Sequence, residues 1–136
     1  MKVVPYLFFE GRCEEAIEFY KTALGAKVNM LMRYQDSPDQ SSCGNIPGDK
    51  IMHASLTIGE DGVLMSDGRC DEPMKFEGFG MALHPADDTE AARYFNALID
   101  GGSVVMPLTK TFFSSSFGMV NDRFGVHWMV VVPTPM

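Results

Sequence analysis

The side chains best suited to chemistry are few in this sequence and lie far apart. The three histidines, His53, His84 and His127, show no HxH or HxxxH spacing, so we expect no histidine metal cluster. The cysteines form no CxxC pair and predict free thiols rather than a disulfide framework or a zinc site; they are Cys13, Cys43 and Cys70. No GxSxG motif surrounds the serines, which argues against a serine hydrolase.

Composition and charge exclude several classes of partner. The chain has 136 residues, 46% of them hydrophobic, which is enough to bury a core. Its net charge of −7 and its pI of about 4.8 leave little positive surface for phosphate groups. We therefore expect neither nucleic acid nor membrane as a partner. The first residues show no signal-length apolar run, and no stretch of ~18 apolar residues follows, so a cytoplasmic location is expected.

Hydrophobic spacing predicts one series of elements in the first half of the chain and the same series in the second. The first half is expected to form a strand, a helix ending before Gly25 and three strands, over residues 3–9, 13–24, 26–34, 50–58 and 63–67. In the second half Asp87 is the predicted N-cap of a helix, with Glu90 three residues later. The elements there are a strand, this helix and three strands, over residues 79–83, 87–99, 103–106, 118–121 and 126–132.

A turn at Gly59-Glu60-Asp61-Gly62 is expected to join two strands of the first half as a hairpin. Counting outward from a four-residue turn pairs Ile58 with Val63, Leu56 with Met65 and Ala54 with Asp67. The predicted helices also match when residues 16–24 are set over residues 91–99, apolar on apolar. The sequence therefore indicates an internal repeat, with a first module at 1–67, a linker at 68–77 and a second module at 78–132.

Several motifs in this order resemble the vicinal oxygen chelate superfamily, which includes glyoxalases, extradiol dioxygenases and bleomycin resistance proteins, and within it the PhnB-like branch. The AIEFYxxxLG motif lies at 16–25 and the DxFG motif at 122–125; the other matching segments are PYLFF, HASL and LMSD. The resemblance implies an α+β fold of two βαβββ modules. Their eight strands would form a curved mixed sheet around a central cavity, and two chains often pair as a homodimer.

Metal-using relatives hold one divalent ion with four ligands, and the resemblance places those positions at Pro5, Met65, Met81 and Met129. Proline has no side-chain donor, and thioethers are soft ligands suited to Cu(I) rather than to zinc, iron or magnesium. A shift of one residue would offer no better set. We therefore expect no metal and no other cofactor, with the methionines serving as adaptable apolar lining.

The same assignment implies which side chains face the cavity. If Met65 and Met129 do, strand alternation turns Asp67 and His127 toward it as well, and these two become weak candidates for proton transfer. The alternative, which we prefer, gives Asp67 a capping role at the turn before Gly68 and His127 a hydrogen bond at a strand end. The expected ligand-binding set is Leu7, Phe9, Val63, Met65, Asp67, Met81, Phe112, Phe113, His127 and Met129.

Three functions remain open on these grounds. The first is metal-free binding of a small apolar or aromatic organic molecule. The second is an isomerase, lyase or dioxygenase that uses a metal or His127 and Asp67, although no catalytic constellation is evident. The third is a structural homodimer whose cavity is filled by its own side chains. Some relatives carry the description of a demethylubiquinone methyltransferase, but no GxGxxG or P-loop supports a methyl-donor site here.

Overall fold

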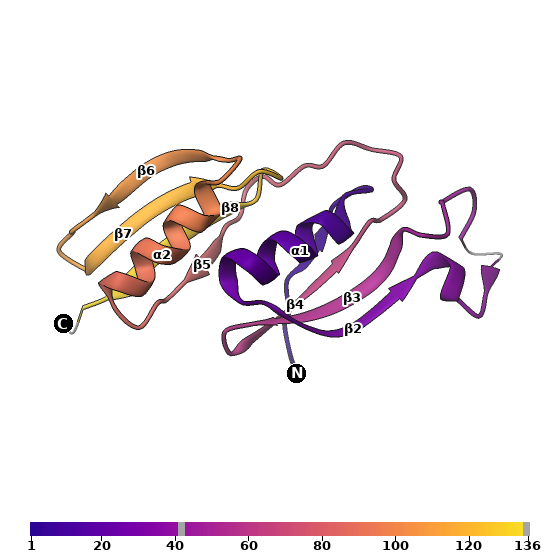
Figure 1. Cartoon of the computed structure of the whole chain (residues 1–136), viewed down its shortest axis with the longest axis horizontal. Coiled ribbons are helices and arrows are strands. Elements are labelled where there is room, and N and C mark those ends of the chain that lie inside the picture. The colour runs from indigo at the N-terminus through magenta and orange to yellow at the C-terminus, as the bar shows by residue number, and fades with distance from the viewer. Residues whose placement is uncertain (41–42, 135–136) are drawn as a thin grey trace. The chain divides into compact units, whose positions relative to one another are not determined.

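The computed structural model describes residues 1–40 and 43–134 and divides the chain into two compact units (Figure 1). Unit 1 comprises Met1–Met74 and unit 2 comprises Lys75–Met136, so the division falls inside the segment expected to be a linker. Each unit contains one long helix and one four-stranded mixed sheet. The strand orders, β1-β4-β3-β2 and β5-β8-β7-β6, are equivalent, which confirms an α+β fold of two βαβββ modules with eight strands in total.

In unit 1 the helix α1 spans Cys13–Leu24, the range predicted from its apolar spacing. It ends at Gly25, whose φ of 67° is the left-handed conformation that favours glycine. A short 3-10 helix, η1 (Tyr34–Asp36), follows the second strand. The strands are β1 (Tyr6–Phe8), β2 (Lys27–Arg33), β3 (Ile51–Ile58) and β4 (Asp61–Ser66).

The hairpin between β3 and β4 differs from the predicted one by two residues. Leu56 pairs with Val63 and Ala54 with Met65, because the loop contains only Gly59 and Glu60. Gly59 has a φ of 63°, which suits the first position of a two-residue hairpin turn. The predicted pairing was wrong because Gly62 suggested a longer turn; a shift of two residues leaves every side chain on the same face.

In unit 2 the helix α2 spans Asp88–Ile99, and its N-cap confirms the prediction. The carboxylate of Asp87 accepts a hydrogen bond from the backbone N–H of Glu90 at 2.8 Å. The strands are β5 (Met81–Leu83), β6 (Ser103–Thr109), β7 (Ser114–Asn121) and β8 (His127–Pro133). Among the helices of the described chain, none is long and apolar enough to cross a membrane.

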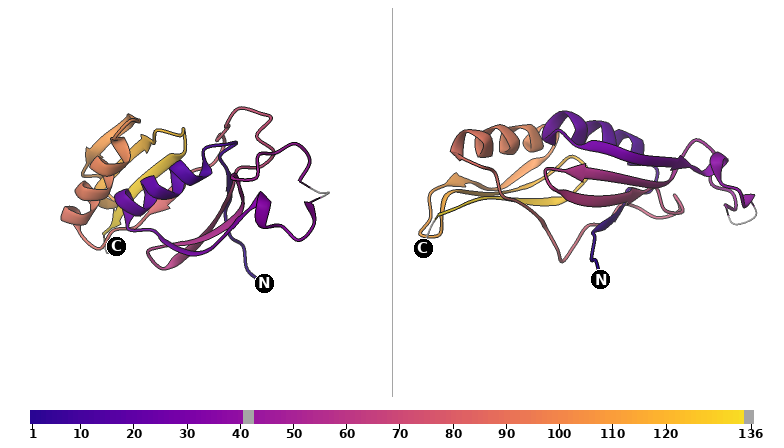
Figure 2. Two further views of the ribbon diagram at one scale, coloured as in Figure 1. Left: turned by 45° about the vertical axis from the view of Figure 1, so that its right-hand side comes forward. Right: turned by 90° about the horizontal axis from the view of Figure 1, so that it is seen from below.

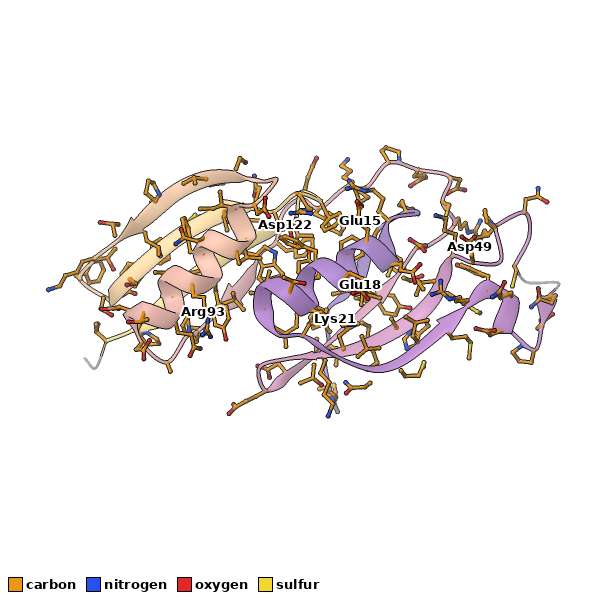
Figure 3. All side chains as sticks on the ribbon, viewed as in Figure 1. Glu15, Glu18, Lys21, Asp49, Arg93 and Asp122 are labelled. Atoms are coloured by element: carbon orange, nitrogen blue, oxygen red, sulfur yellow. The ribbon has the colours of Figure 1, made fainter. Side chains whose placement is uncertain are left out.

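Each helix covers one face of the sheet in its own unit (Figure 2). Its charged side chains lie on the solvent side; Figure 3 labels Glu15, Glu18 and Lys21 on α1 and Arg93 on α2, all of which are exposed. Its apolar side chains pack onto the sheet, as the rings of Tyr20 and Phe9 show with centroids 6.2 Å apart. The opposite face of each sheet carries no helix of that unit and is called the open face below.

A buried carboxylate holds the loops together in each unit. In unit 1 Asp67 accepts backbone N–H groups from Gly11 at 2.9 Å, Cys13 at 2.7 Å and Ile51 at 2.7 Å, and it is 1% exposed. It thereby ties the entry of α1 to the start of β3.

In unit 2 the corresponding role belongs to Asp122, which opens the DxFG motif. Its carboxylate accepts the backbone N–H groups of Phe124 at 2.9 Å and Val126 at 3.1 Å, and the indole N–H of Trp128 at 2.9 Å. Gly125 adopts a φ of 91° in the same turn. The motif is thus explained by the turn that joins β7 to β8.

Candidate functional site

The structure places four of the residues expected to contact a ligand inside the core of unit 1. Leu7, Phe9, Val63 and Met65 are at most 3% exposed. Met65 pairs across the sheet with Leu7 and with Ala54, so these side chains share the face that α1 covers. This placement corrects their expected orientation, because a molecule lying against the open face cannot reach them.

The open face of unit 1 instead carries the side chains of alternate parity. Tyr6 and Phe8 of β1 are 37% and 50% exposed although both are aromatic. Their rings are stacked, with centroids 4.9 Å apart and planes inclined by 16°. The exposed parts of these two rings therefore form an aromatic surface on this side of the sheet.

A histidine lies beside this aromatic pair. The hydroxyl of Tyr6 and Nδ1 of His53 are 2.8 Å apart, and the two ring centroids are 5.6 Å apart. Burial is the main cause that raises the pKa of the Tyr6 phenol, so Tyr6 keeps its proton at neutral pH. Its parity on β3, opposite to that of the buried Ala54 and Leu56, places His53 on the open face.

The rest of this open face is mainly neutral. Strand alternation and register place Lys27 there, opposite Thr57 and four residues along β3 from His53. The other side chains besides the three rings are amide, hydroxyl and apolar groups. They are Asn29, Met30, Met32, Ser55, Thr57 and Leu64. We call the set of Tyr6, Phe8 and His53 the aromatic site.

The open face of unit 2 contains His127 and Met129. Nδ1 of His127 lies 2.9 Å from the side-chain oxygen of Asn121, which fixes the plane of the imidazole ring. The ring lies against Gly80, where a Cβ atom would be 2.9 Å from Cδ2 of His127. Met129 pairs with Ala82 and Met119 on the same face, whereas Met81 pairs with the buried Trp128 on the face that α2 covers.

Three phenylalanines of unit 2 form a contiguous cluster around the start of β7. The rings of Phe112 and Phe113 and those of Phe113 and Phe117 meet edge to face, with centroids 5.1 Å apart in both pairs. Phe112 is 90% exposed, while Phe117 is buried. This cluster keeps Phe112 and Phe113 as candidates for contact with an aromatic molecule.

The two candidates for proton transfer, Asp67 and His127, belong to different units, and each has hydrogen-bond partners inside its own unit. Both oxygens of Asp67 accept backbone N–H groups, which is the work of a structural carboxylate. The structure therefore gives Asp67 a structural role, but the N–H groups that its carboxylate accepts belong to Gly11, Cys13 and Ile51 and not to the predicted turn before Gly68.

The positions that hold metal in related proteins do not fit a metal ion here. Pro5 offers no side-chain donor, Met65 is fully buried under α1, and Met81 and Met129 lie on opposite faces of their sheet. The nearest open-face alternatives, Tyr6, Leu64 and Ala82, make no set of hard ligands. Across residues 1–40 and 43–134, no three His, Cys, Asp or Glu side chains gather where they could hold a metal.

The cysteines are unpaired, and Cys13 and Cys43 are buried. Burial, reinforced by the charge of Asp67, raises the pKa of the Cys13 thiol far above its ordinary value. Burial also raises the pKa of Cys70, which lies near acidic side chains. Around Cys70 the acidic side chains outweigh the positive charge of Lys50, so neither thiol has the net electropositive surroundings that produce a reactive thiolate.

Comparison with known proteins agrees with this architecture. The model of a family described as 3-demethylubiquinone-9 3-methyltransferase matches residues 1–131. The chain belongs to this family.

Among relatives of this chain, protein YjdN of Escherichia coli K12 is 34% identical, over 97% of this chain and 95% of that protein. The crystal structure of PA1353 from Pseudomonas aeruginosa is 41% identical, with a TM-score of 0.84 and 99% of both chains covered. A PhnB protein from Bacillus cereus is 25% identical with a TM-score of 0.82, and the match covers 97% of this chain and 99% of that one. The fosfomycin resistance protein FosX from Mesorhizobium loti shares the fold alone, at 12% identity and a TM-score of 0.65 over 98% and 92%. The fold is accordingly that of the vicinal oxygen chelate superfamily.

Proposed function

We propose that this chain is a PhnB-like protein that binds a small apolar or aromatic molecule without a metal ion. The supporting observation is the aromatic site, where the stacked rings of Tyr6 and Phe8 stay substantially exposed on a sheet face that has no helix of its unit. An aromatic ring that stacks on them removes apolar surface of both partners from water. Phe112 and Phe113 are a second place in the chain where a flat molecule could stack.

The metal-free part of the proposal is supported by the donor groups at the positions where relatives hold their ion. Thioethers and a proline supply no hard ligand, and the open faces carry mainly hydroxyl, amide and apolar groups. An isomerase, lyase or dioxygenase using His127 and Asp67 is a less suitable function, because the oxygens of Asp67 already accept three backbone N–H groups.

Methyl transfer, which the description of the family names, is not the function we propose. A nucleoside-containing methyl donor typically binds at a Gly-rich turn between strand and helix in a doubly wound parallel sheet. Each sheet here contains one parallel pair of strands, β1 with β4 and β5 with β8, and its other pairs are antiparallel. A homodimer in the cytoplasm is part of our proposal on the strength of the superfamily resemblance.

Titration with p-xylene tests the proposal, because this probe is aromatic and has no polar group. Protein purified without affinity metal and kept in chelator is labelled with ¹⁵N, and backbone amide shifts are followed as p-xylene is added. We expect saturable shifts centred on β1 and its neighbours in the sheet. Phe8→Ala should weaken the binding by about tenfold, since it removes one of the stacked rings.

Phe79→Ala is the matched control. Phe79 is also a half-exposed phenylalanine, at 46%, but it lies in unit 2 and outside the aromatic site. Elemental analysis of the same sample measures bound metal. A lack of saturable shifts, binding that depends on an added divalent ion, or equal losses in both variants would contradict the proposed function.

A further inference from the structure

We propose that the ring bound at the aromatic site carries a hydroxyl group and that Nε2 of His53 binds this hydroxyl. The inference rests on the proposed function and narrows its ligand to hydroxylated aromatic molecules. It starts from the one polar ring in the site, which lies beside the stacked pair on the same face.

The imidazole of His53 has one nitrogen engaged and one available. Nδ1 is 2.8 Å from the Tyr6 hydroxyl, while Nε2 has no hydrogen-bond partner in the described part of the chain. Every buried side-chain nitrogen or oxygen among those residues has a partner, so Nε2 must be accessible to solvent. A ligand can therefore reach it without displacing a protein contact.

The Tyr6 contact also fixes how the imidazole is presented. Tyr6 is stacked on Phe8, and its hydroxyl holds the ring of His53 with the centroids 5.6 Å apart. A benzene ring lying against Phe8 and Tyr6 can thus direct a substituent toward His53. Because the imidazole is already oriented, little side-chain entropy is lost when its second hydrogen bond forms.

A hydroxyl group matches Nε2 in either form of the neutral histidine. If Tyr6 donates to Nδ1, Nε2 carries the proton and donates to the ligand; if Tyr6 accepts from Nδ1, Nε2 accepts from the ligand. A hydroxyl oxygen can accept and donate, whereas a carbonyl or an ether oxygen can only accept. The geometry therefore favours a hydroxyl over the other oxygen substituents.

The groups next to His53 do not favour a charged ligand group. Its cross-strand neighbour is Met32, and the lysine of this face, Lys27, lies opposite Thr57, four residues along β3. An anion placed beside His53 would lose hydration without a lysine or arginine opposite it. Ser55 lies on the same face, next to Leu64 and Met30, and offers a further hydroxyl.

Binding of 4-methylphenol and p-xylene, compared by the same amide titration, tests the inference. The two probes differ by a hydroxyl in place of a methyl group. We expect 4-methylphenol to bind about three- to tenfold more tightly, the range given by one net hydrogen bond. His53→Leu should abolish this preference while p-xylene affinity is kept, and His53→Gln, whose amide lies near the position of Nε2, should restore part of it. His84→Leu, at an exposed histidine outside the site, is the control and should change neither affinity.

The outcomes separate the inference from the proposed function. Equal affinities for both probes, each reduced by Phe8→Ala, would overturn the hydroxyl assignment and leave apolar binding in place. A preference that survives in His53→Leu would also overturn it, because another group would then bind the hydroxyl. If neither probe binds, both the inference and the proposed function fail.

Discussion

Asp67 provides a direct test of the structural reasoning, because one carboxylate satisfies three backbone N–H groups. Asp67→Ala leaves the N–H groups of Gly11, Cys13 and Ile51 without their acceptor in a region that is almost fully buried. A buried donor without a partner costs about 1–2 kcal/mol when some water enters, so we expect a loss of about 3–6 kcal/mol in the free energy of unfolding. Asp67→Asn keeps one oxygen and should lose about 1–3 kcal/mol.

Equilibrium unfolding in guanidinium chloride, followed by far-ultraviolet circular dichroism, measures these losses. The transition midpoint should fall without a change in slope if the native and unfolded surfaces are unaltered. Asp71→Ala is the control, because Asp71 is exposed and close to Asp67 in the chain; its effect should be within about 0.5 kcal/mol. A loss below about 1 kcal/mol for Asp67→Ala would refute the reasoning, since the three N–H groups would then have other partners.

Two further substitutions test the assignment of faces. Met65→Ala should lower the free energy of unfolding by about 2–5 kcal/mol, because Met65 is fully buried under α1. Met129→Ala removes a partly exposed side chain and should lower it by less than about 1 kcal/mol in the same unfolding experiment. Similar losses for the two variants would contradict the assignment of faces. Gly80→Ala should displace the ring of His127 and break its contact with Asn121, seen as changed ring ¹⁵N shifts. Gly62→Ala is the control and should leave that spectrum unchanged, because a Cβ there would have no neighbour closer than 3.9 Å. Unchanged ring ¹⁵N shifts of His127 in Gly80→Ala would contradict the contact between this ring and Gly80.

Local signals in the sequence predicted the helices well. The helix over Cys13–Leu24 has apolar residues at helical spacing and a glycine that takes a positive φ after its last turn. The N-cap at Asp87 was predictable because its carboxylate needs only a backbone N–H three residues away. In both cases the determining contacts lie within a few residues.

The orientation of the first strand could not be predicted, because both of its faces are apolar. Tyr6 and Phe8 alternate with Leu7 and Phe9, so no polar residue marks the exposed side. Register shows which residues share a face, but the packing of α1 decides which face is covered. The aromatic site was therefore missed, although the parity of His53, opposite to that of the apolar Ala54 and Leu56, indicated which face of β3 is open.

The DxFG turn has a consequence for spectroscopy. Trp128 is the single tryptophan of the chain, is 1% exposed and donates its indole N–H to Asp122. Its fluorescence therefore reports on unit 2 alone, at a position where loss of the turn exposes the indole to water. Three of the four tyrosines, Tyr6, Tyr20 and Tyr34, belong to unit 1. Selectively excited tryptophan fluorescence follows the unfolding of unit 2, and far-ultraviolet circular dichroism follows the backbone of both units. Comparing the two signals can therefore distinguish the unfolding of the two units in one unlabelled sample.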